Sequence, residues 1–280
     1  MNTIFKEVLH KGLKQEILIK KVLVDMTSKY QKIQVFDTLI YGKMLVLDGI
    51  IQVTEKDEAA YSEMLVHPAM QILKNPKDIL IVGGGDGAVA EEVLKYNFIN
   101  KIDLVDIDEE VIKVSKRYFK KINKSSLSNK KVNLFYEDAL NFITNTKNKY
   151  DLIIADRPDP VGAGKSLFKK KFYNNVKNIL KHNGFAIFQS GVTFLQKKET
   201  IEVIKHVKSI FEKSGVILTV VPSYIGGFMT LVWSSNQIDM LKSKVIKGRK
   251  KIKTSYYNDE IRKASLSAPN FIKIILWNIQ

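Results

Sequence analysis

The chain has no cysteine, and only four of its 280 residues are histidine. Without cysteine there is no disulfide bond, no cysteine nucleophile and no thiolate-bound zinc or iron–sulfur cluster. The histidines are His10, His67, His182 and His206, and no two of them have the spacing of a metal-binding pair. We therefore expect no dedicated metal centre.

Long apolar runs are also missing. No stretch approaches the ~18 consecutive apolar residues that a membrane-spanning helix needs, and the first residues lack the apolar core of a signal peptide. Apolar residues make up 45% of the chain and charged residues 26%, which excludes wholesale disorder. We expect a soluble, cytoplasmic protein with no membrane partner.

Acidic residues are scarce in one half of the chain. Residues 1–159 carry 24 basic and 23 acidic side chains, whereas residues 160–280 carry 21 and 6, so the net charge of +16 is concentrated in the second half. A basic surface is one mark of a nucleic-acid-binding protein. However, the lysines are scattered along amphipathic segments, apart from one run between Lys244 and Lys253. This pattern favours a solvated lysine-rich surface and leaves nucleic-acid binding as an alternative.

Short apolar runs alternate with amphipathic segments from residue 78 onward. The predicted strands cover 78–82, 101–106, 132–136, 150–155, 184–189, 216–221 and 229–233. The predicted helices cover 87–96, 109–122, 138–145, 166–181 and 197–213. Apolar strands joined by helical crossovers predict a doubly wound, mostly parallel seven-stranded Rossmann-like sheet. The loop at 222–228 is too short for a helix, so the last two strands should pair antiparallel.

The first 54 residues have a different pattern. Alternating segments around Ile33 and Met44 are interrupted at Tyr41-Gly42 and at Asp48-Gly49. Asp-Gly between two apolar runs is a hairpin signal. We predict a small antiparallel β domain at 1–54 and a Rossmann-like catalytic domain at 55–280, joined by a helix over residues 57–73.

A glycine-rich loop, Gly83-Gly84-Gly85-Asp86-Gly87, follows the first strand of the α/β part. Glycines there allow close approach of a ligand to a helix N-terminus. Asp106 ends the next strand, where a carboxylate can accept hydrogen bonds from ribose hydroxyls. The unit predicts an adenosine-type ligand. Asp86 inside the loop disfavours a phosphate and favours a cationic ligand group, although it can equally cap the following helix.

Further acidic residues follow the third and fourth strands. Asp138 follows the third strand, and Asp156 and Asp159 follow the fourth. Because the carboxyl ends of parallel strands meet at one edge, these carboxylates should face one another across a ligand site. Paired carboxylates there can bind a cation and accept a proton.

Five motifs in order resemble the spermidine synthases, the family of polyamine aminopropyltransferases. They are residues 54–64 (TEKDEAAYSEM), the glycine loop at 83–87, Asp106-Ile107-Asp108-Glu109, Asp156-x-x-Asp159-Pro160 and Tyr256-Tyr257-Asn258. The resemblance extends over about residues 30–275. Residues 188–191 and 222–227 are similar to the branch found in enteric bacteria.

The resemblance implies transfer of an aminopropyl group from decarboxylated S-adenosylmethionine to a diamine, usually putrescine. It implies that the nucleoside is a co-substrate, that no cofactor is needed, and that the chain forms a homodimer or homotetramer. By resemblance, Asp156 is the proton acceptor. The other implied substrate contacts are Asp159, Tyr61, Gln52 and Tyr224 for the diamine, Asp86 for the aminopropyl amine, Gln31 and Asp106 for the ribose, and Asp138 and Ala139 for the adenine.

The sequence departs from the family pattern at several positions. Ser62 stands where a histidine is common, and Ala163 replaces a proline in the loop over the nucleoside. Both remain in the predicted substrate site. Asp106 is one methylene shorter than the usual glutamate. Arg157 stands between the two aspartates, where it either lowers the pKa of Asp156 or points to solvent.

Two other functions are compatible with parts of the pattern. A methyltransferase that uses intact S-adenosylmethionine would share the fold, but Asp86 and Asp156 argue against it, since Asp86 would face the carboxylate of that molecule. A basic nucleic-acid-binding protein with an unused nucleoside site is the second alternative, and salt-dependent binding to duplex DNA would reveal it.

Overall fold

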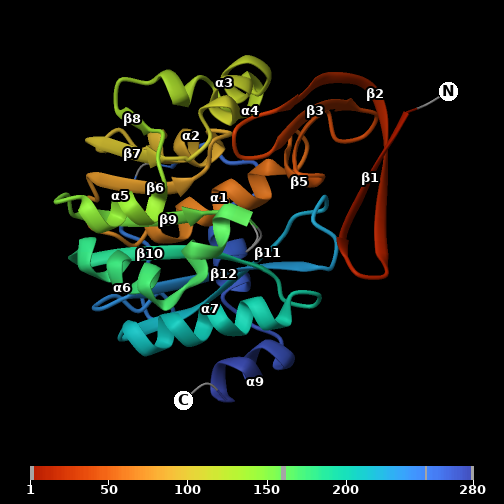
Figure 1. Cartoon of the computed structure of the whole chain (residues 1–280). Coiled ribbons are helices and arrows are strands. Elements are labelled where there is room, and N and C mark those ends of the chain that lie inside the picture. Colours follow the sequence, from red (N-terminus) through yellow and green to blue (C-terminus); the bar gives the residue numbers. More distant parts are fainter. Residues whose placement is uncertain (1–2, 159–161, 250, 279–280) are drawn as a thin grey trace.

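The computed structural model describes residues 3–158, 162–249 and 251–278. Two β-sheets follow each other along the chain (Figure 1). The first is red to orange in the figure, and the second occupies the middle of the molecule with helices on both of its faces. This confirms the predicted fold class, a small antiparallel β domain followed by a mostly parallel α/β domain.

The N-terminal sheet has five antiparallel strands in sequence order. These are β1 (Thr3–His10), β2 (Leu13–Thr27), β3 (Lys32–Thr38), β4 (Lys43–Leu47) and β5 (Ile50–Thr54). Asp48 and Gly49, with φ of 48° and 81°, form the tight turn between β4 and β5, as the Asp-Gly signal predicted. The sequence pattern did not predict β1 and β2 as individual strands. The expected boundary after residue 54 stays a prediction.

The second sheet has seven strands in the order β11-β12-β10-β9-β6-β7-β8. Their bounds are β6 (Asp78–Gly83), β7 (Lys101–Val105), β8 (Val132–Phe135), β9 (Tyr150–Asp156), β10 (Leu180–Val192), β11 (Lys213–Val220) and β12 (Phe228–Ser235). β12 is antiparallel to β11, as the short loop between them predicted, and it is also antiparallel to β10. β6 lies between β9 and β7, so the loops that follow these three strands are neighbours.

The helices cover the sheet on two sides, and the strand period of two explains why. Ile79 and Ile81 of β6 pack on one face in one core cluster, whereas Leu80 and Val82 pack on the other face in a second cluster. The helices are α1 (Glu58–Met70), α2 (Ala88–Leu94), α3 (Glu109–Tyr118), α4 (Lys120–Asn123), α5 (Ala139–Asn145), α6 (Lys170–Ile179), α7 (Lys197–Ile210), α8 (Asp259–Ser265) and α9 (Asn270–Asn278). Among the described residues, no helix is long and apolar enough to cross a bilayer.

Two predicted helices differ from the structure in their bounds. The single helix expected over 109–122 is divided at Phe119 into α3 and α4, since Phe119 has a non-helical conformation (φ −109°, ψ 25°). The helix expected from residue 166 begins only at Lys170 and is preceded by the 3₁₀ helix Gly162–Phe168. No prediction for α8 and α9 came from the sequence pattern.

Candidate active site

A cleft of about 250 Å³ lies where the carboxyl ends of β6, β7 and β9 meet the N-terminal sheet. Nine of the twelve predicted site residues line it, namely Gln31, Gln52, Tyr61, Asp86, Asp106, Asp138, Ala139, Asp156 and Tyr224. They come from both sheets, from α1 and from loops that are far apart in the sequence. The expectation that the strand-end acids share one site therefore agrees with the geometry.

The glycine loop forms the floor of the cleft, because the backbone there passes very close to its neighbours. A Cβ on Gly83, whose φ is +79°, would lie 1.9 Å from the backbone oxygen of Asp156, and one on Gly85 would lie 2.6 Å from Asp106 Oδ2. Only glycine allows this approach. As a result, the carboxylates that follow β6, β7 and β9 surround a single space.

Three carboxylates in this space bind protons more tightly than free aspartates do. Burial, followed by repulsion from Asp86, raises the pKa of Asp156 to about 8. Burial also raises the pKa of Asp106 to about 6 and shifts the pKa of Asp86 upward. All three keep some contact with the open cleft, so a cationic ligand that enters can neutralise them directly. The site is thus built for positive charge.

Tyr61 holds Asp156 from α1. Its hydroxyl donates a 2.8 Å hydrogen bond to Asp156 Oδ1, and this bond lowers the pKa of Asp156 against the effect of burial. The Tyr61 ring meets the Tyr224 ring edge-on, with the ring centres 5.9 Å apart. Tyr224 in turn donates its hydroxyl to the backbone oxygen of Gln52. The two tyrosines therefore form one wall that joins the α/β domain to the N-terminal sheet.

Asp86 has one oxygen engaged by its own loop. Asp86 Oδ1 accepts a 2.7 Å hydrogen bond from the Ala88 N–H at the start of α2. Asp138 likewise caps α5 by accepting from the Asn141 N–H at 2.9 Å. Asp138 is thus both the N-cap of α5 and part of the cleft wall, whereas Gly87 is the N-cap of α2 and Asp86 binds the Ala88 N–H from the loop before it.

Asp108 connects Gln31 and Asp106 at one end of the cleft. Asp108 Oδ2 accepts hydrogen bonds from Gln31 Nε2 at 3.0 Å and from Ser28 Oγ at 2.6 Å. The Asp108 N–H donates to Asp106 Oδ1 at 3.0 Å. Asp108 belongs to the motif after the second α/β strand, but no role for it was predicted from the sequence. In the structure it fixes both residues that were predicted to contact the ribose.

Glu7 lines the opposite end of the cleft and was missed by the sequence analysis. Its carboxylate accepts hydrogen bonds from the Ile51 N–H at 2.8 Å and from Gln15 Nε2 at 3.3 Å. Gln15 also donates to the backbone oxygen of Ser223, next to Tyr224, at 2.9 Å. The sequence signal was a glutamate two positions after Phe5, on the inward face of a strand.

Of the three remaining predicted site residues, Asp159 and Ala163 have side chains that the structure does not describe, and Ser62 lies away from the cleft. Asp159 lies outside the described residues. Ala163 lies in the 3₁₀ helix Gly162–Phe168. Ser62 is buried inside α1, where its hydroxyl donates to Glu58 Oε2 at 2.6 Å. A side chain as short as serine stays within its own helix, so the structure does not bring Ser62 to the cleft.

Arg157 takes neither of the two positions considered for it. It is only 2% exposed, and its guanidinium donates to the backbone oxygen of Leu167 and, at 2.7 Å, to the Tyr173 hydroxyl. The guanidinium carbon lies 3.7 Å from the centre of the Phe168 ring. Arg157 is not among the groups that shift the pKa of Asp156. It ties the segment after Asp156 to the core rather than acting on the carboxylate.

Within the described residues, no group of three or more histidines and acids is arranged to hold a metal ion. The expectation of a reaction without metal or cofactor stays a prediction. The polar groups of the cleft include carboxylates, tyrosine hydroxyls and backbone groups, which suit the binding of two cationic molecules and the removal of a proton.

The sheet order, the glycine loop and the acidic cleft define an enzyme of the Rossmann-like transferase class. Comparison with known proteins identifies the family within this class. Residues 58–244 match the spermine/spermidine synthase domain, and residues 3–55 match the spermidine synthase tetramerisation domain. The chain therefore belongs to the spermine/spermidine synthase family.

Individual relatives agree with this assignment. The polyamine aminopropyltransferase of Buchnera aphidicola subsp. Acyrthosiphon pisum (strain APS) is 40% identical over 271 residues, which is 95% of each chain. That of Salmonella paratyphi B (strain ATCC BAA-1250 / SPB7) is 33% identical over 276 residues, 97% of this chain and 96% of the relative. The enzyme is thus a polyamine aminopropyltransferase.

Solved structures are similar over almost the whole chain. A crystal structure of spermidine synthase in complex with the transition state analogue AdoDATO superposes with a TM-score of 0.93 at 30% identity, covering 99% of this chain and 95% of that one. Spermidine synthase from Thermotoga maritima superposes with a TM-score of 0.90 at 29% identity, covering 98% and 94%.

Proposed function

We propose that the enzyme transfers the aminopropyl group of decarboxylated S-adenosylmethionine to putrescine, giving spermidine and methylthioadenosine. The observation that carries this proposal is the cluster of Asp86, Asp106 and Asp156 around one cleft, with pKa values raised by burial, because such carboxylates are stabilised when a cationic ligand binds beside them. The similarity to a spermidine synthase that binds the transition state analogue AdoDATO supports the same chemistry.

In the proposed reaction, Asp156 is the base. The amine of putrescine binds as an ammonium ion, and Asp156 accepts one of its protons, since a protonated nitrogen has no electron pair to donate. The freed nitrogen attacks the methylene next to the sulfonium. A carbon–nitrogen bond forms as the carbon–sulfur bond breaks, and its electron pair stays on sulfur. Methylthioadenosine then leaves as a neutral molecule.

The other side chains align the two substrates. Tyr61 and Tyr224 form the wall beside the diamine, and Gln52, on β5 of the N-terminal sheet, accepts the hydrogen bond of the Tyr224 hydroxyl through its backbone oxygen. Asp86 pairs with the amine of the aminopropyl group, while Gln31 and Asp106 hold the ribose and Asp138 and Ala139 the adenine. We also propose that Asp159 binds the diamine, that no cofactor takes part, and that the enzyme acts in the cytoplasm as an oligomer.

The test is product formation by the Asp156→Asn variant with a panel of amine acceptors, read by mass spectrometry. We expect putrescine to be the best acceptor of the parent enzyme and the variant to lose about 10²-fold or more in kcat, the typical contribution of a general base. Methylthioadenosine affinity should change by less than about threefold, because Asn keeps the shape of the side chain.

A variant that turns over like the parent would show that Asp156 is not the base. A panel in which spermidine or a longer amine is preferred would reject putrescine while leaving aminopropyl transfer intact. Methyl transfer from intact S-adenosylmethionine, without aminopropyl transfer, would favour the methyltransferase alternative.

A further inference from the structure

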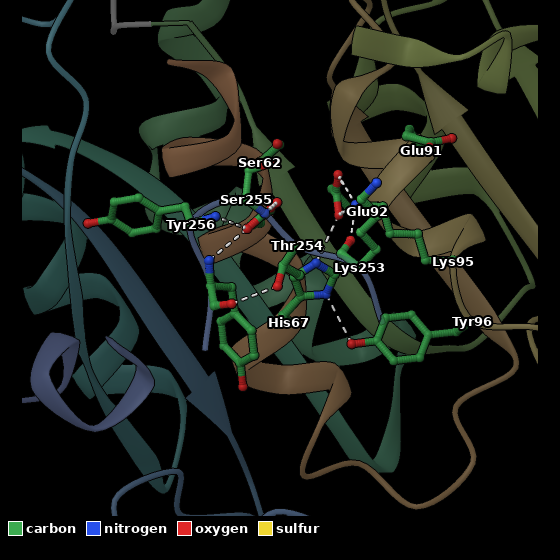
Figure 2. Close-up of polar contacts among 12 residues, drawn as sticks. Ser62, His67, Glu91, Glu92, Lys95, Tyr96, Lys253, Thr254, Ser255 and Tyr256 are labelled. Carbon is green, nitrogen blue, oxygen red and sulfur yellow. Dashed lines mark hydrogen bonds and ion pairs between the residues drawn. The ribbon is translucent and has the colours of Figure 1, made fainter. Parts of the chain in front are cut away.

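Two parts of the motifs that carry the family resemblance have been given no role in the cleft, and the structure joins them. One is Glu63, near the end of the motif at 54–64. The other is Tyr256-Tyr257-Asn258, more than 190 residues later. Figure 2 shows Ser255 and Tyr256 beside the helix that carries Ser62 and His67. We call residues 253–258 the C-terminal strap.

Glu63 holds the strap through three hydrogen bonds. Its Oε1 accepts from the Ser255 N–H at 2.7 Å, and its Oε2 accepts from the N–H groups of Tyr256 at 2.8 Å and Tyr257 at 2.7 Å. Thr254 Oγ1 donates to the Tyr257 backbone oxygen at 2.7 Å, which closes the turn and aims the three N–H groups at one point. Glu63 is 1% exposed. Hydrogen bonds to a buried carboxylate are among the strong ones.

A second set of contacts ties the strap to α2. Lys95, which follows α2, donates to the backbone oxygen of Lys253 at 3.0 Å and to Glu92 Oε1 at 2.7 Å. His67 of α1 bonds Glu92 Oε2 at 2.8 Å, and its ring lies 5.2 Å from the Tyr257 ring. Figure 2 shows Glu92, Lys95 and Tyr96 grouped on one side of His67. The strap thus meets α1 and α2 at a buried polar cluster.

This cluster lies behind the catalytic side of α1. Tyr61 and Glu63 are two residues apart on the helix, so their side chains leave it about 200° apart, on nearly opposite sides. Tyr61 reaches Asp156 on the cleft side, and Glu63 reaches the strap on the other side. A rotation of α1 about its axis therefore cannot loosen one contact without disturbing the other.

We propose that Glu63 is a positioning residue: by gripping the C-terminal strap it fixes the rotation of α1 and so keeps the Tyr61 hydroxyl on Asp156. The inference rests on the proposed role of Asp156 as the base. It assigns to the Tyr256-Tyr257-Asn258 motif the function of supplying the backbone N–H groups that Glu63 grips, with Asn258 capping α8 immediately afterwards through the Ile261 N–H.

The test measures the pH dependence of kcat in Glu63→Gln, which keeps the shape but leaves only one oxygen to accept hydrogen bonds. The Tyr61 hydrogen bond lowers the pKa of Asp156. Losing this hydrogen bond should therefore raise the pKa of Asp156 and move the acidic limb of the kcat profile to higher pH by about half a unit to one unit. At a fixed pH below the limb, kcat should then fall by about threefold to tenfold. Tyr61→Phe should shift the limb in the same direction.

The sign of the shift separates positioning from other effects. Removing the negative charge of Glu63 would by electrostatics alone move the limb to lower pH. General destabilisation would lower the active fraction without moving the limb. Combining Glu63→Gln with Tyr61→Phe should add no further shift, because both act through one hydrogen bond. Tyr256→Phe, which keeps the backbone N–H, is the matched control and should behave like the parent.

Thr254→Val gives a milder version of the same test if Glu63→Gln does not fold, since it loosens only the turn. A limb that stays in place in the folded variant, or shifts that add in the double variant, would overturn the positioning role. Activity retained by Asp156→Asn would instead reject the proposed base, so the two failures are distinguishable.

Discussion

Asp156 binds a proton tightly because its side chain is buried and other carboxylates lie close to it. Its pKa of about 8 and that of Asp106, about 6, are both raised first by burial and then by neighbouring carboxylates. An aspartate with this proton affinity is a stronger base than one in water. The same property disfavours the empty enzyme, because ionising the cleft brings like charges together.

The stability of the empty enzyme should therefore fall as pH rises. An acid whose pKa is raised on folding binds more protons in the folded state, so stability is lost between the unfolded value, 3.8, and the folded value of about 8. Asp156→Asn removes this loss. We expect its Tm to exceed that of the parent by at least about 2 °C at pH 8.5, and the difference to become small near pH 4, where Asp156 of the folded parent is uncharged like the asparagine.

Thermal denaturation of the two proteins across this pH range measures the effect, with exposed Glu137→Gln as the control that should follow the parent. A Tm difference that is the same at pH 4 and pH 8.5 would mean that Asp156 ionises as an ordinary aspartate and that burial does not raise its pKa.

The glycine loop shows how the elements bring the acids together. β6 lies between β9 and β7, and the bare backbone at Gly83 allows the loop to touch the chain at Asp156. Gly84 N–H completes this contact by donating to the Asp156 backbone oxygen at 3.1 Å. The shape of the cleft thus depends on there being no side chain at position 83.

Gly83→Ala should disrupt both stability and nucleoside binding. The new Cβ would meet backbone 1.9 Å away, so β6 and β9 must separate, which adds an overpacking cost of about 1–3 kcal/mol to about 1–2 kcal/mol for a side chain at positive φ. Gly12→Ala is the matched control, with a φ of +83° but nothing within 4 Å of the added Cβ. Urea unfolding and methylthioadenosine titration measure both effects.

Equal losses in the two variants would show that the backbone conformation, and not the close approach to Asp156, is what requires glycine at position 83. Gly12 lies in the β1–β2 turn, so its variant should bind methylthioadenosine like the parent.

At the level of elements, the sequence predicted the strands and helices that local residue patterns define. The strands from β6 to β9 were found because their apolar runs end at glycine or at acidic residues, and their parallel order placed Asp86, Asp106, Asp138 and Asp156 at one edge. Arg157 and Glu7 could not be placed in this way, because the positions of their side chains depend on residues far along the chain. The cage of Phe168 and Tyr173 around Arg157 has no signature in the sequence.

The N-terminal sheet lines one side of the cleft, and its outer surface carries several exposed apolar side chains among charged ones. Ile4 and Leu18 are opposite each other on β1 and β2 and are 44% and 42% exposed. Val22, further along β2, is 44% exposed. Exposed apolar side chains gathered on one sheet mark an association surface, and the match of residues 3–55 to a tetramerisation domain supports this interpretation.

Charges on this surface should separate the subunits. Ile4→Lys combined with Leu18→Lys places two like charges on a directly opposed pair, which disfavours burial against another subunit. We expect light scattering after size-exclusion chromatography to show a smaller species than the parent. Leu241→Lys is the control, since Leu241 is 61% exposed but lies far along the chain from the sheet.

Activity links this assembly to the cleft. Glu7 is on β1, three residues after Ile4, and its carboxylate holds Ile51 and Gln15 at the end of the cleft where we propose that the diamine binds. If association stiffens the β1–β2 hairpin, the double variant should have a raised KM for putrescine with a nearly unchanged affinity for methylthioadenosine, whose predicted contacts lie at the other end. An unchanged oligomeric state would show that Ile4 and Leu18 do not lie in the subunit interface. A smaller species with an unaltered KM would show that the hairpin holds Glu7 in place without help from a second subunit.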